Sequence, residues 1–182
     1  DPDAVSPVAP PGIKPYNSHL HLMEAYAELY RIWPDPLLKE RIAELIFIVV
    51  NTVRDPHHNQ NIDYWTEDWK VIATPTNLRA SYGHDIETVW LTLDAAQAIG
   101  LSRILLRSWA LAITGKVIEK GWDNEHGGLF ATGPLGQTAD DTHKVWWVQA
   151  EALVGFLYLH KFTGDATYMD SFMRTLDFVE SH

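Results

Sequence analysis

Three short segments of the sequence hold side chains that could bind a polar ligand or transfer a proton. In the first, Asn17, His21 and Glu24 are spaced i, i+4 and i+7, which places them on one face of a helix. Such a face could line a polar cavity. A capping asparagine and a hydrogen-bonded core histidine would explain the same spacing, so this segment alone leaves both interpretations open.

The second segment places a histidine beside a carboxylate at the start of a helix. Gly83 interrupts the chain, and His84 and Glu87 then follow at a spacing of i, i+3. A carboxylate in that position could hydrogen-bond the imidazole, fix its tautomer and raise its basicity, as a general base near neutral pH requires. The helix dipole acts in the opposite direction, because it disfavours imidazolium at a helix N-terminus. A surface histidine in an acidic first turn is the alternative.

The third segment combines aromatic rings with a carboxylate. Trp146 and Trp147 are adjacent, so on a helix their side chains point about 100° apart, and we expect one of them to face a cavity. Trp147 and Glu151 (i, i+4) share a face, which suits a stacking platform beside a hydrogen-bonding carboxylate. Two core tryptophans and a solvent-exposed glutamate would also satisfy the pattern.

The other candidate residues give weaker indications of function. His57 and His58 lie in a loop and are not expected to bind metal, and Trp90 and Trp109 fall on apolar faces that predict core positions. The acidic and aromatic segment 63–69 could flank a sugar site, although a loop packing its own aromatic rings is favoured. The sequence has no His-Glu-x-x-His, Gly-x-Gly-x-x-Gly or Gly-x-Ser-x-Gly motif.

The elements that must position these segments are helices in a repeating order. Glu24, Glu87 and Glu151 are 63 and 64 residues apart, and each lies in the first helix of a predicted helical pair. A repeat of this length with two helices per unit indicates stacked hairpins. After an extended lead-in over 1–16, we expect about three hairpins, at 17–53, 84–120 and 143–182. Gly164 and Asp165 are expected to cap the two helices of the last one.

The connections predict where these hairpins expose a site. The long ones, 54–83 and 121–142, gather at one end and include possible short strands at 64–72 and 127–132. Loops gathered on one face of a scaffold commonly carry its site. We therefore predict an all-α protein, an (α/α)6 toroid or barrel of which this chain supplies about half and whose remaining parts are missing. Closure about an axis would bring the histidines, glutamates and tryptophans together.

Composition narrows the class of function. The 182 residues carry a formal net charge of −10, with a pI near 5.2, which argues against binding nucleic acid or an anionic membrane. The absence of cysteine excludes disulfides and thiolate metal sites and fits a reducing compartment, so we expect a cytoplasmic protein. Eight tryptophans are an excess, and aromatic rings often stack on the apolar faces of sugars.

The three segments also carry a resemblance to a known family. NSHLHLMEAY, SYGHDIETVWL and KVWWVQAEALVGFLYL resemble the N-acylglucosamine 2-epimerase superfamily, and within it they are most similar to the cellobiose 2-epimerases. The resemblance runs from about residue 14 to the end and covers the middle of an (α/α)6 barrel. It implies an isomerase that reversibly epimerises C2 of the reducing-end glucose of cellobiose and related β-1,4-disaccharides such as lactose, without metal or other cofactor.

The resemblance also assigns roles. It implies ring opening, removal of the proton at C2, a cis-enediol and reprotonation from the opposite face. His84 would be one acid/base catalyst supported by Glu87, while His21 and Asn17 would bind the sugar and assist ring opening. The residues expected to line the pocket and bind the glucose units are Trp146, Trp147 and Glu151.

Some alternatives remain open at this stage. The family's second catalytic histidine is expected beyond residue 182, and neither His160 nor His182 matches its motif, so we expect the chain to be catalytically incomplete alone. A mannose isomerase would use the same enediol and reprotonate C1. A glycoside hydrolase needs a pair of carboxyl groups across the glycosidic bond, which a His-Glu pair fits poorly. A non-catalytic helical-repeat module is the fourth possibility. The oligomeric state is not fixed by the sequence.

Overall fold

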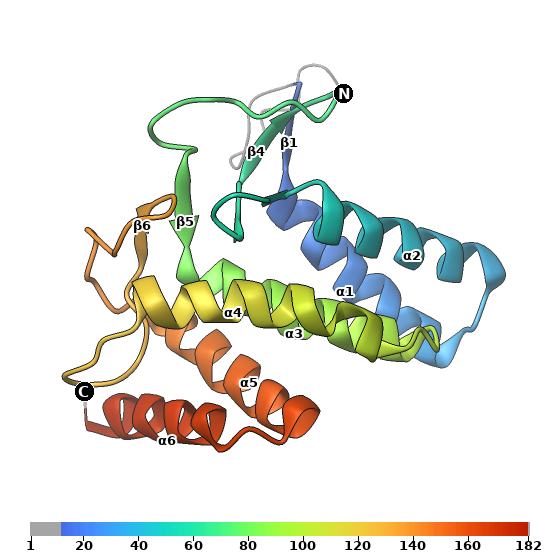
Figure 1. Ribbon diagram of the computed structural model, residues 1–182. Coiled ribbons are helices and arrows are strands. Elements are labelled where there is room, and N and C mark those ends of the chain that lie inside the picture. Colours follow the sequence, from blue (N-terminus) through green and yellow to red (C-terminus); the bar gives the residue numbers. More distant parts are fainter. Residues whose placement is uncertain (1–11, 182) are drawn as a thin grey trace.

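The computed structural model describes residues 12–181, which form three helical hairpins (Figure 1). The predicted lead-in therefore lies mostly outside the described residues. The helices of the three hairpins are α1 (Tyr16–Ile32) and α2 (Pro36–Asn51), α3 (Tyr82–Ala98) and α4 (Arg107–Gly121), and α5 (Trp146–Thr163) and α6 (Ala166–Ser181). The predicted order of three helical pairs is confirmed.

The first helices of the hairpins lie side by side. α3 packs between α1 and α5, and each of these three helices also packs against the second helix of its own hairpin. Apolar side chains from all three first helices form one core, with Leu20 and Met23 on α1, Ile86 on α3 and Phe156 on α5 completely buried. α3 is therefore covered by protein on several sides, which explains why polar side chains on it are buried as well.

Local signals set several helix ends. Asp35 accepts a hydrogen bond from the Leu37 N–H at 2.8 Å, and Pro36 occupies the first position of α2. At the other end of a helix, Gly164 ends α5 in the left-handed conformation with φ of 76°. Asp165 then accepts the Thr167 N–H at 2.9 Å. The capping roles predicted for Gly164 and Asp165 are confirmed.

Some boundaries differ from the predicted ones. α1 begins at Tyr16, within the expected lead-in, α3 begins at Tyr82 and α5 begins only at Trp146. The second helix of the middle hairpin opens with a 3-10 turn, Arg103–Leu106, before α4. Such short turns are common at helix termini, where hydrogen bonding is incomplete.

Short strands join the long connections at the end where the first helices start. β1 (Ile13–Pro15) pairs with β4 (Tyr64–Thr66), β2 (Arg54–Asp55) with β3 (Gln60–Asn61), and β5 (Arg79–Ser81) with β6 (Thr132–Pro134), all antiparallel. Figure 1 shows β1 leading into α1 and β5 leading into α3. The segments 64–72 and 127–132 were expected to contain short hairpin strands, and β4 and the first residue of β6 fall within them. Their main strand pairings are instead between segments far apart in the sequence, which periodicity cannot reveal.

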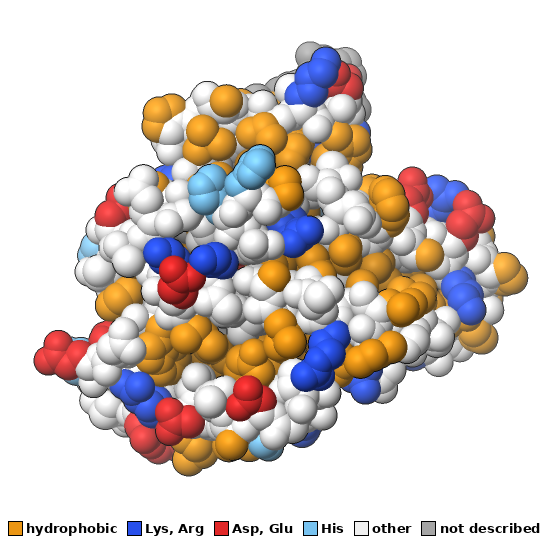
Figure 2. Space-filling view, viewed as in Figure 1, with side chains coloured by type: hydrophobic (Ala, Val, Ile, Leu, Met, Phe, Trp, Pro, Cys, Tyr) orange, Lys and Arg blue, Asp and Glu red, His pale blue; other side chains and the backbone are white. Residues whose placement is uncertain are grey.

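The visible surface is mixed in character. On the face shown in Figure 2, charged side chains of both signs are interspersed, and hydrophobic side chains gather between α4 and α6. This distribution differs from the clustered basic surface with which proteins bind nucleic acid. No helix within residues 12–181 has the length and apolarity needed to cross a membrane.

Candidate active site

The N-terminal halves of α1 and α3 meet through His21. Its Nδ1 lies 2.9 Å from Glu24 Oε2 on its own helix, and its Nε2 lies 3.6 Å from Glu87 Oε1 on α3. His21 is about half exposed, whereas the Glu87 side chain is 7% exposed. One imidazole therefore bridges two carboxylates, one open to solvent and one buried.

His84 is held between two aromatic rings from different helices. Its ring lies 4.9 Å from that of Trp147 on α5, measured between centroids, and meets the edge of Tyr16 on α1 at 5.9 Å. The nearest carboxylate is that of Asp63, whose Oδ1 is 3.7 Å from His84 Nδ1. Packing between Tyr16 and Trp147 fixes the plane of the imidazole, so its Nδ1 edge faces the β3–β4 loop.

The carboxylate partner expected for His84 was Glu87, and the structure corrects that expectation. Within residues 12–181, Glu87 contacts the imidazole of His21, and Asp63 takes the place beside His84. The physical reason is that α1 packs against α3 on the side where Glu87 projects. A spacing of i, i+3 permits a contact within one helix, but a neighbouring helix can offer a better partner.

Glu151 on α5 joins the same region through Trp90. The Trp90 indole N–H donates a hydrogen bond of 2.8 Å to Glu151 Oε2. Trp90 was predicted as a core residue from its apolar face. It does pack against the core, but it is only partly buried, and its polar edge orients a carboxylate. Glu151 is also close enough to Glu87 for its negative charge to raise the pKa of Glu87.

Of the two remaining predicted residues, Trp146 lies away from this cluster, and Asn17 has an unpaired side-chain oxygen. Trp146 is 80% exposed and lines a groove against α6 with Lys144, Gln149 and Phe178. It therefore points away from Trp147, as adjacent helix positions require, and its role in sugar binding stays a prediction. Asn17 is partly buried on α1, and its Oδ1 is a buried acceptor without a hydrogen-bond partner within the described residues.

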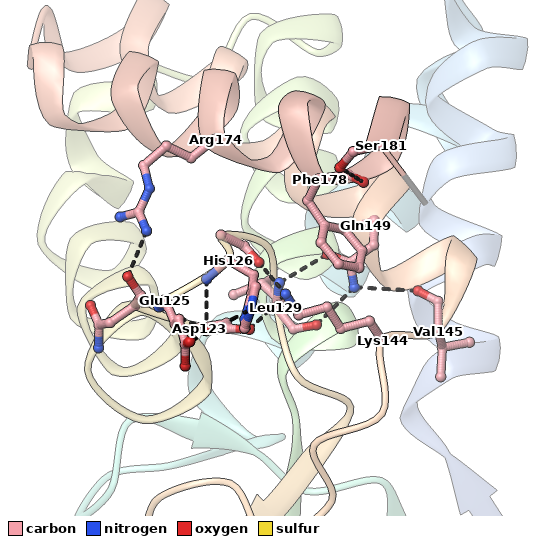
Figure 3. A network of polar contacts seen from close by, with 12 residues as sticks. Asp123, Glu125, His126, Leu129, Lys144, Val145, Gln149, Arg174, Phe178 and Ser181 are labelled. Atoms are coloured by element: carbon pink, nitrogen blue, oxygen red, sulfur yellow. Dashed lines mark hydrogen bonds and ion pairs between the residues drawn. The ribbon is translucent and has the colours of Figure 1, made fainter.

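The start of α5, which carries Trp147, is anchored by a polar network shown in Figure 3. The Gln149 side-chain amide pairs with both backbone groups of Leu129, at 2.9 Å to the N–H and 2.7 Å to the carbonyl. Lys144 lies 2.8 Å from Asp123 Oδ2 and 3.8 Å from the centroid of the Phe178 ring. These contacts hold the loop before α5 against both the α4–β6 connection and α6.

Burial and neighbouring charges shift the acid–base properties of the site. Burial raises the pKa of Glu87 to about 7, with a further rise from Glu151, while the two histidines act in the opposite direction. Burial also raises the pKa of Glu151. For His84, burial lowers the pKa, but the carboxylates of Asp63, Glu87 and Asp85 together outweigh that effect, so the pKa lies above its usual value. Both imidazoles thus share one electrostatic environment with Glu87 and Glu151.

These groups can perform proton transfer on a bound polar molecule. A neutral His84 with its Nδ1 proton toward Asp63 leaves the Nε2 lone pair free to accept a proton. Trp147 offers an aromatic face beside it. Within the part of the chain that the structure describes, no cluster of three or more histidine, aspartate or glutamate side chains could hold a metal ion.

Sequence reasoning missed Tyr16, Asp63 and Asp85. Asp85 follows His84 directly, is 1% exposed and accepts the Asn61 N–H at 2.9 Å. Burial raises its pKa to about 7. A sequence signal existed for Asp63, since the acidic and aromatic segment 63–69 had been considered as a flank of a sugar site, but it was assigned to loop packing.

The comparisons with known proteins agree on one family. Residues 5–182 match the family model described as N-acylglucosamine 2-epimerase (GlcNAc 2-epimerase). A cellobiose 2-epimerase of Bacteroides fragilis is 29% identical over 171 residues, which cover 93% of this chain and 42% of that protein. A D-mannose isomerase of Thermobifida fusca is 27% identical over 167 residues, which cover 84% of this chain and 40% of that protein.

A solved structure supports the same relationship. The structure of cellobiose 2-epimerase from Bacillus thermoamylovorans superposes with a TM-score of 0.82 and 34% identity, covering 92% of this chain and 41% of that one. The predicted (α/α)6 class is thereby confirmed. The chain spans about 40% of the length of the relatives it matches.

Proposed function

Because the chain belongs to the N-acylglucosamine 2-epimerase family, we propose that it forms part of a sugar epimerase acting at C2 of a reducing-end glucose. The proposed substrates are cellobiose and related β-1,4-disaccharides, and the products carry mannose at that end. The observation that carries the proposal is the meeting of His21, Glu87 and His84 beside Trp147, on three neighbouring first helices. The identity to cellobiose 2-epimerases supports the substrate class.

The proposed chemistry moves one proton without net oxidation. Ring opening exposes the C1 aldehyde, which acidifies the proton on C2. The Nε2 of neutral His84 accepts that proton, and the electron pair of the broken C–H bond forms the C1=C2 double bond of an enediolate, in which O1 carries the negative charge. Delivery of a proton to the opposite face of C2 and re-formation of the carbonyl complete the epimerisation.

The other residues would bind and orient the sugar. Trp147 would stack on the sugar ring beside His84, and Glu151, held by Trp90, would accept hydrogen bonds from hydroxyl groups. His21 would assist ring opening through a hydroxyl or the ring oxygen, with its imidazole oriented by its contacts with Glu24 and Glu87. Asn17 would supply an amide on the same face of α1.

Epimerisation also needs a second acid, which delivers a proton to the opposite face of C2. By the resemblance of its motifs, we expect a histidine outside these 182 residues to supply it. His160 is a poor candidate, because its Nδ1 lies 2.9 Å from the backbone carbonyl of Asp165, at the far end of α5.

An aldose–ketose isomerase is the second candidate function. It is favoured by one observation, the 27% identity to a D-mannose isomerase over 84% of this chain. The same enediol would then be reprotonated at C1, giving a ketose. The His84 cluster serves both reactions, because removal of the C2 proton is common to them.

The test uses the complete gene product with cellobiose as substrate. We expect a mannose-ended disaccharide and, in deuterated water, incorporation of deuterium at C2. A fructose-ended product would instead establish the isomerase. His84→Ala should lower kcat by about 10²-fold or more while circular dichroism stays unchanged, because general acid–base catalysis contributes ~10²–10⁴. His57→Ala, in an exposed loop, is the matched control and should change kcat little.

Two results would refute the proposal. One is the absence of both product formation and C2 exchange in the wild-type protein. The other is a His84→Ala variant whose kcat stays within about tenfold of the wild-type value.

A further inference from the structure

Asp63 occupies a firmly held position in the loop between β3 and β4. Its backbone carbonyl accepts the Tyr16 N–H at 2.8 Å, which ties the loop to the first residue of α1. The next residue, Tyr64, donates its N–H to Asn77 Oδ1 at 2.8 Å, and its carbonyl accepts the Asn77 amide at 2.7 Å. The Asp63 side chain therefore projects from a backbone that is fixed on both sides.

The ring nitrogen that faces Asp63 has no hydrogen-bond partner at normal distance. His84 Nδ1 is buried and unpaired within the described residues, although buried polar atoms are almost always satisfied. Asp63 Oδ1 lies 3.7 Å away. A charge-assisted hydrogen bond needs about 2.8 Å, so a movement of about 1 Å would form it. Catalytic hydrogen bonds commonly shorten in this way when substrate binds.

Two aromatic rings restrict the plane of the His84 imidazole. Its centroid lies 4.9 Å from that of Trp147, and Tyr16 meets it at 5.9 Å with the two rings nearly perpendicular. Within that plane the Nδ1 edge faces Asp63, and Nε2 lies on the far side of the ring from Cγ.

We propose that Asp63 is a positioning residue for His84: its carboxylate accepts the Nδ1–H, which presents Nε2 as the base and stabilises the imidazolium that forms when Nε2 takes the proton. This inference rests on the proposed function of His84. In the step itself, the proton passes from C2 to Nε2 and the electron pair remains in the sugar. Asp63 accepts the Nδ1–H and does not itself take part in the proton transfer, like the carboxylate that orients a catalytic histidine in hydrolases.

Other charged groups near His84 do not replace Asp63. Asp85 and Glu87 are on the same helix and also raise the pKa of His84, but Asp63 raises it most. Asp85 is engaged by the Asn61 N–H, and Glu87 by His21. From α5, Glu151 is held by Trp90, and the hydroxyl of Tyr16 on α1 is 3.2 Å from Thr88 Oγ1. Among the described residues, Asp63 is thus the carboxylate that lies within 4 Å of His84 Nδ1.

The experiment compares Asp63→Asn, Asp63→Glu and Asp68→Asn in the complete gene product. Asp68 follows β4 in the same connection between α2 and α3, and its exposed carboxylate pairs with Lys70 at 2.6 Å, so Asp68→Asn removes an equal charge away from His84. Two quantities are measured: the pH profiles of kcat and KM with cellobiose, and the titration and tautomer of His84 by NMR with 15N-labelled histidine. The second does not depend on turnover.

For Asp63→Asn we expect kcat to fall about tenfold or more, a smaller loss than the ~10²–10⁴ contributed by the base itself, with a smaller change in KM. The limb of the pH profile set by His84 and its NMR titration should both move to lower pH, because imidazolium loses its counter-charge. The Nδ1–H tautomer should be less populated. Asp63→Glu should restore the carboxylate and recover part of kcat, and Asp68→Asn should match the wild-type protein.

The outcomes separate this inference from the proposed function. If the wild-type protein is inactive on cellobiose but His84 titrates lower in Asp63→Asn, the substrate proposal fails and the pairing is upheld. If the wild-type protein is active and neither the pH profile nor the His84 titration differs between Asp63→Asn and Asp68→Asn, the positioning role is refuted. If Asp63→Asn fails to fold, Asp63→Glu decides: a folded variant that keeps the wild-type His84 titration and at least part of kcat upholds the carboxylate requirement, and one that keeps the carboxylate but shows a shifted His84 titration together with a kcat as low as that of His84→Ala overturns it.

Discussion

The buried carboxyl of Asp85 should make the protein less stable as the pH rises through the neutral range. Asp85 is 1% exposed in the first turn of α3, and its Oδ1 accepts the Asn61 N–H at 2.9 Å. Its Oδ2 has no hydrogen-bond partner within the described residues. Burial therefore raises the pKa from 3.8 to about 7, because the charged form is poorly solvated there.

The sign and size of the effect follow from proton linkage. Between about pH 4 and pH 7 the folded protein keeps the Asp85 proton and the unfolded chain loses it, so the free energy of unfolding falls as pH rises. The stabilising contribution is fully present below pH 4 and is lost once the pH passes 7. One pH unit corresponds to about 1.4 kcal/mol, and the partial titration near pH 7 leaves a loss of about 2 kcal/mol between pH 5 and pH 7.

The assay is urea unfolding of the complete gene product at pH 5, 6 and 7. Asp85→Asn keeps an acceptor for the Asn61 N–H but removes the titrating group, so it should reduce the pH dependence of the free energy of unfolding by about 2 kcal/mol over this range. Asp68→Asn is the control, because its exposed carboxyl should leave the wild-type dependence unchanged. Equal pH dependence in wild-type and Asp85→Asn proteins would show that the buried carboxyl does not hold its proton.

Two further substitutions test the packing and the hydrogen bonding of the site. Gly83→Ala would place a Cβ 2.6 Å from the Trp147 ring, so we expect a loss of ~1–3 kcal/mol in unfolding free energy together with reduced kcat. Gly115→Ala, where a Cβ meets nothing within 4 Å, should instead stabilise helix α4 by ~0.5–1 kcal/mol, and equal effects at both positions would contradict the packing argument. Trp90→Phe removes the N–H that Glu151 accepts and should lower kcat/KM about tenfold, since hydrogen bonds to charged groups contribute ~1.5–3 kcal/mol. A change in kcat/KM of less than threefold would mean that this hydrogen bond does not serve binding.

The sequence predicted the parts of the site that depend on helical periodicity. Glu24, Glu87 and Glu151 recur at a nearly constant interval, and helices that repeat in this way pack with equivalent faces together. That regularity is sufficient to predict that His21 and Glu87 approach each other, as they do at 3.6 Å. The step of about 100° between adjacent helix positions also predicts that the side chains of Trp146 and Trp147 point in different directions.

The contribution of loops could not be predicted in the same way. Asp63 faces His84 only because β1 pairs with β4 and Tyr16 binds the Asp63 carbonyl. Those pairings join residues about fifty positions apart, and no local pattern specifies them. Trp90 shows a related limit, because an indole on an apolar face can pack in the core and still direct its N–H at a carboxylate.

The surplus of carboxyl groups around the two imidazoles has a consequence for the proposed reaction. The enediolate formed when C2 loses its proton carries negative charge on O1, and fully ionised Asp85, Glu87 and Glu151 would repel it. Burial counters this repulsion, since it raises the pKa of Asp85 and Glu87 to about 7 and so reduces their average negative charge near neutral pH. Asp63 is a third exposed and is the carboxylate beside His84 Nδ1. The site thus combines one carboxylate that faces the imidazole with buried carboxyl groups of reduced charge, and this division of roles would be lost if all of them were equally hydrated.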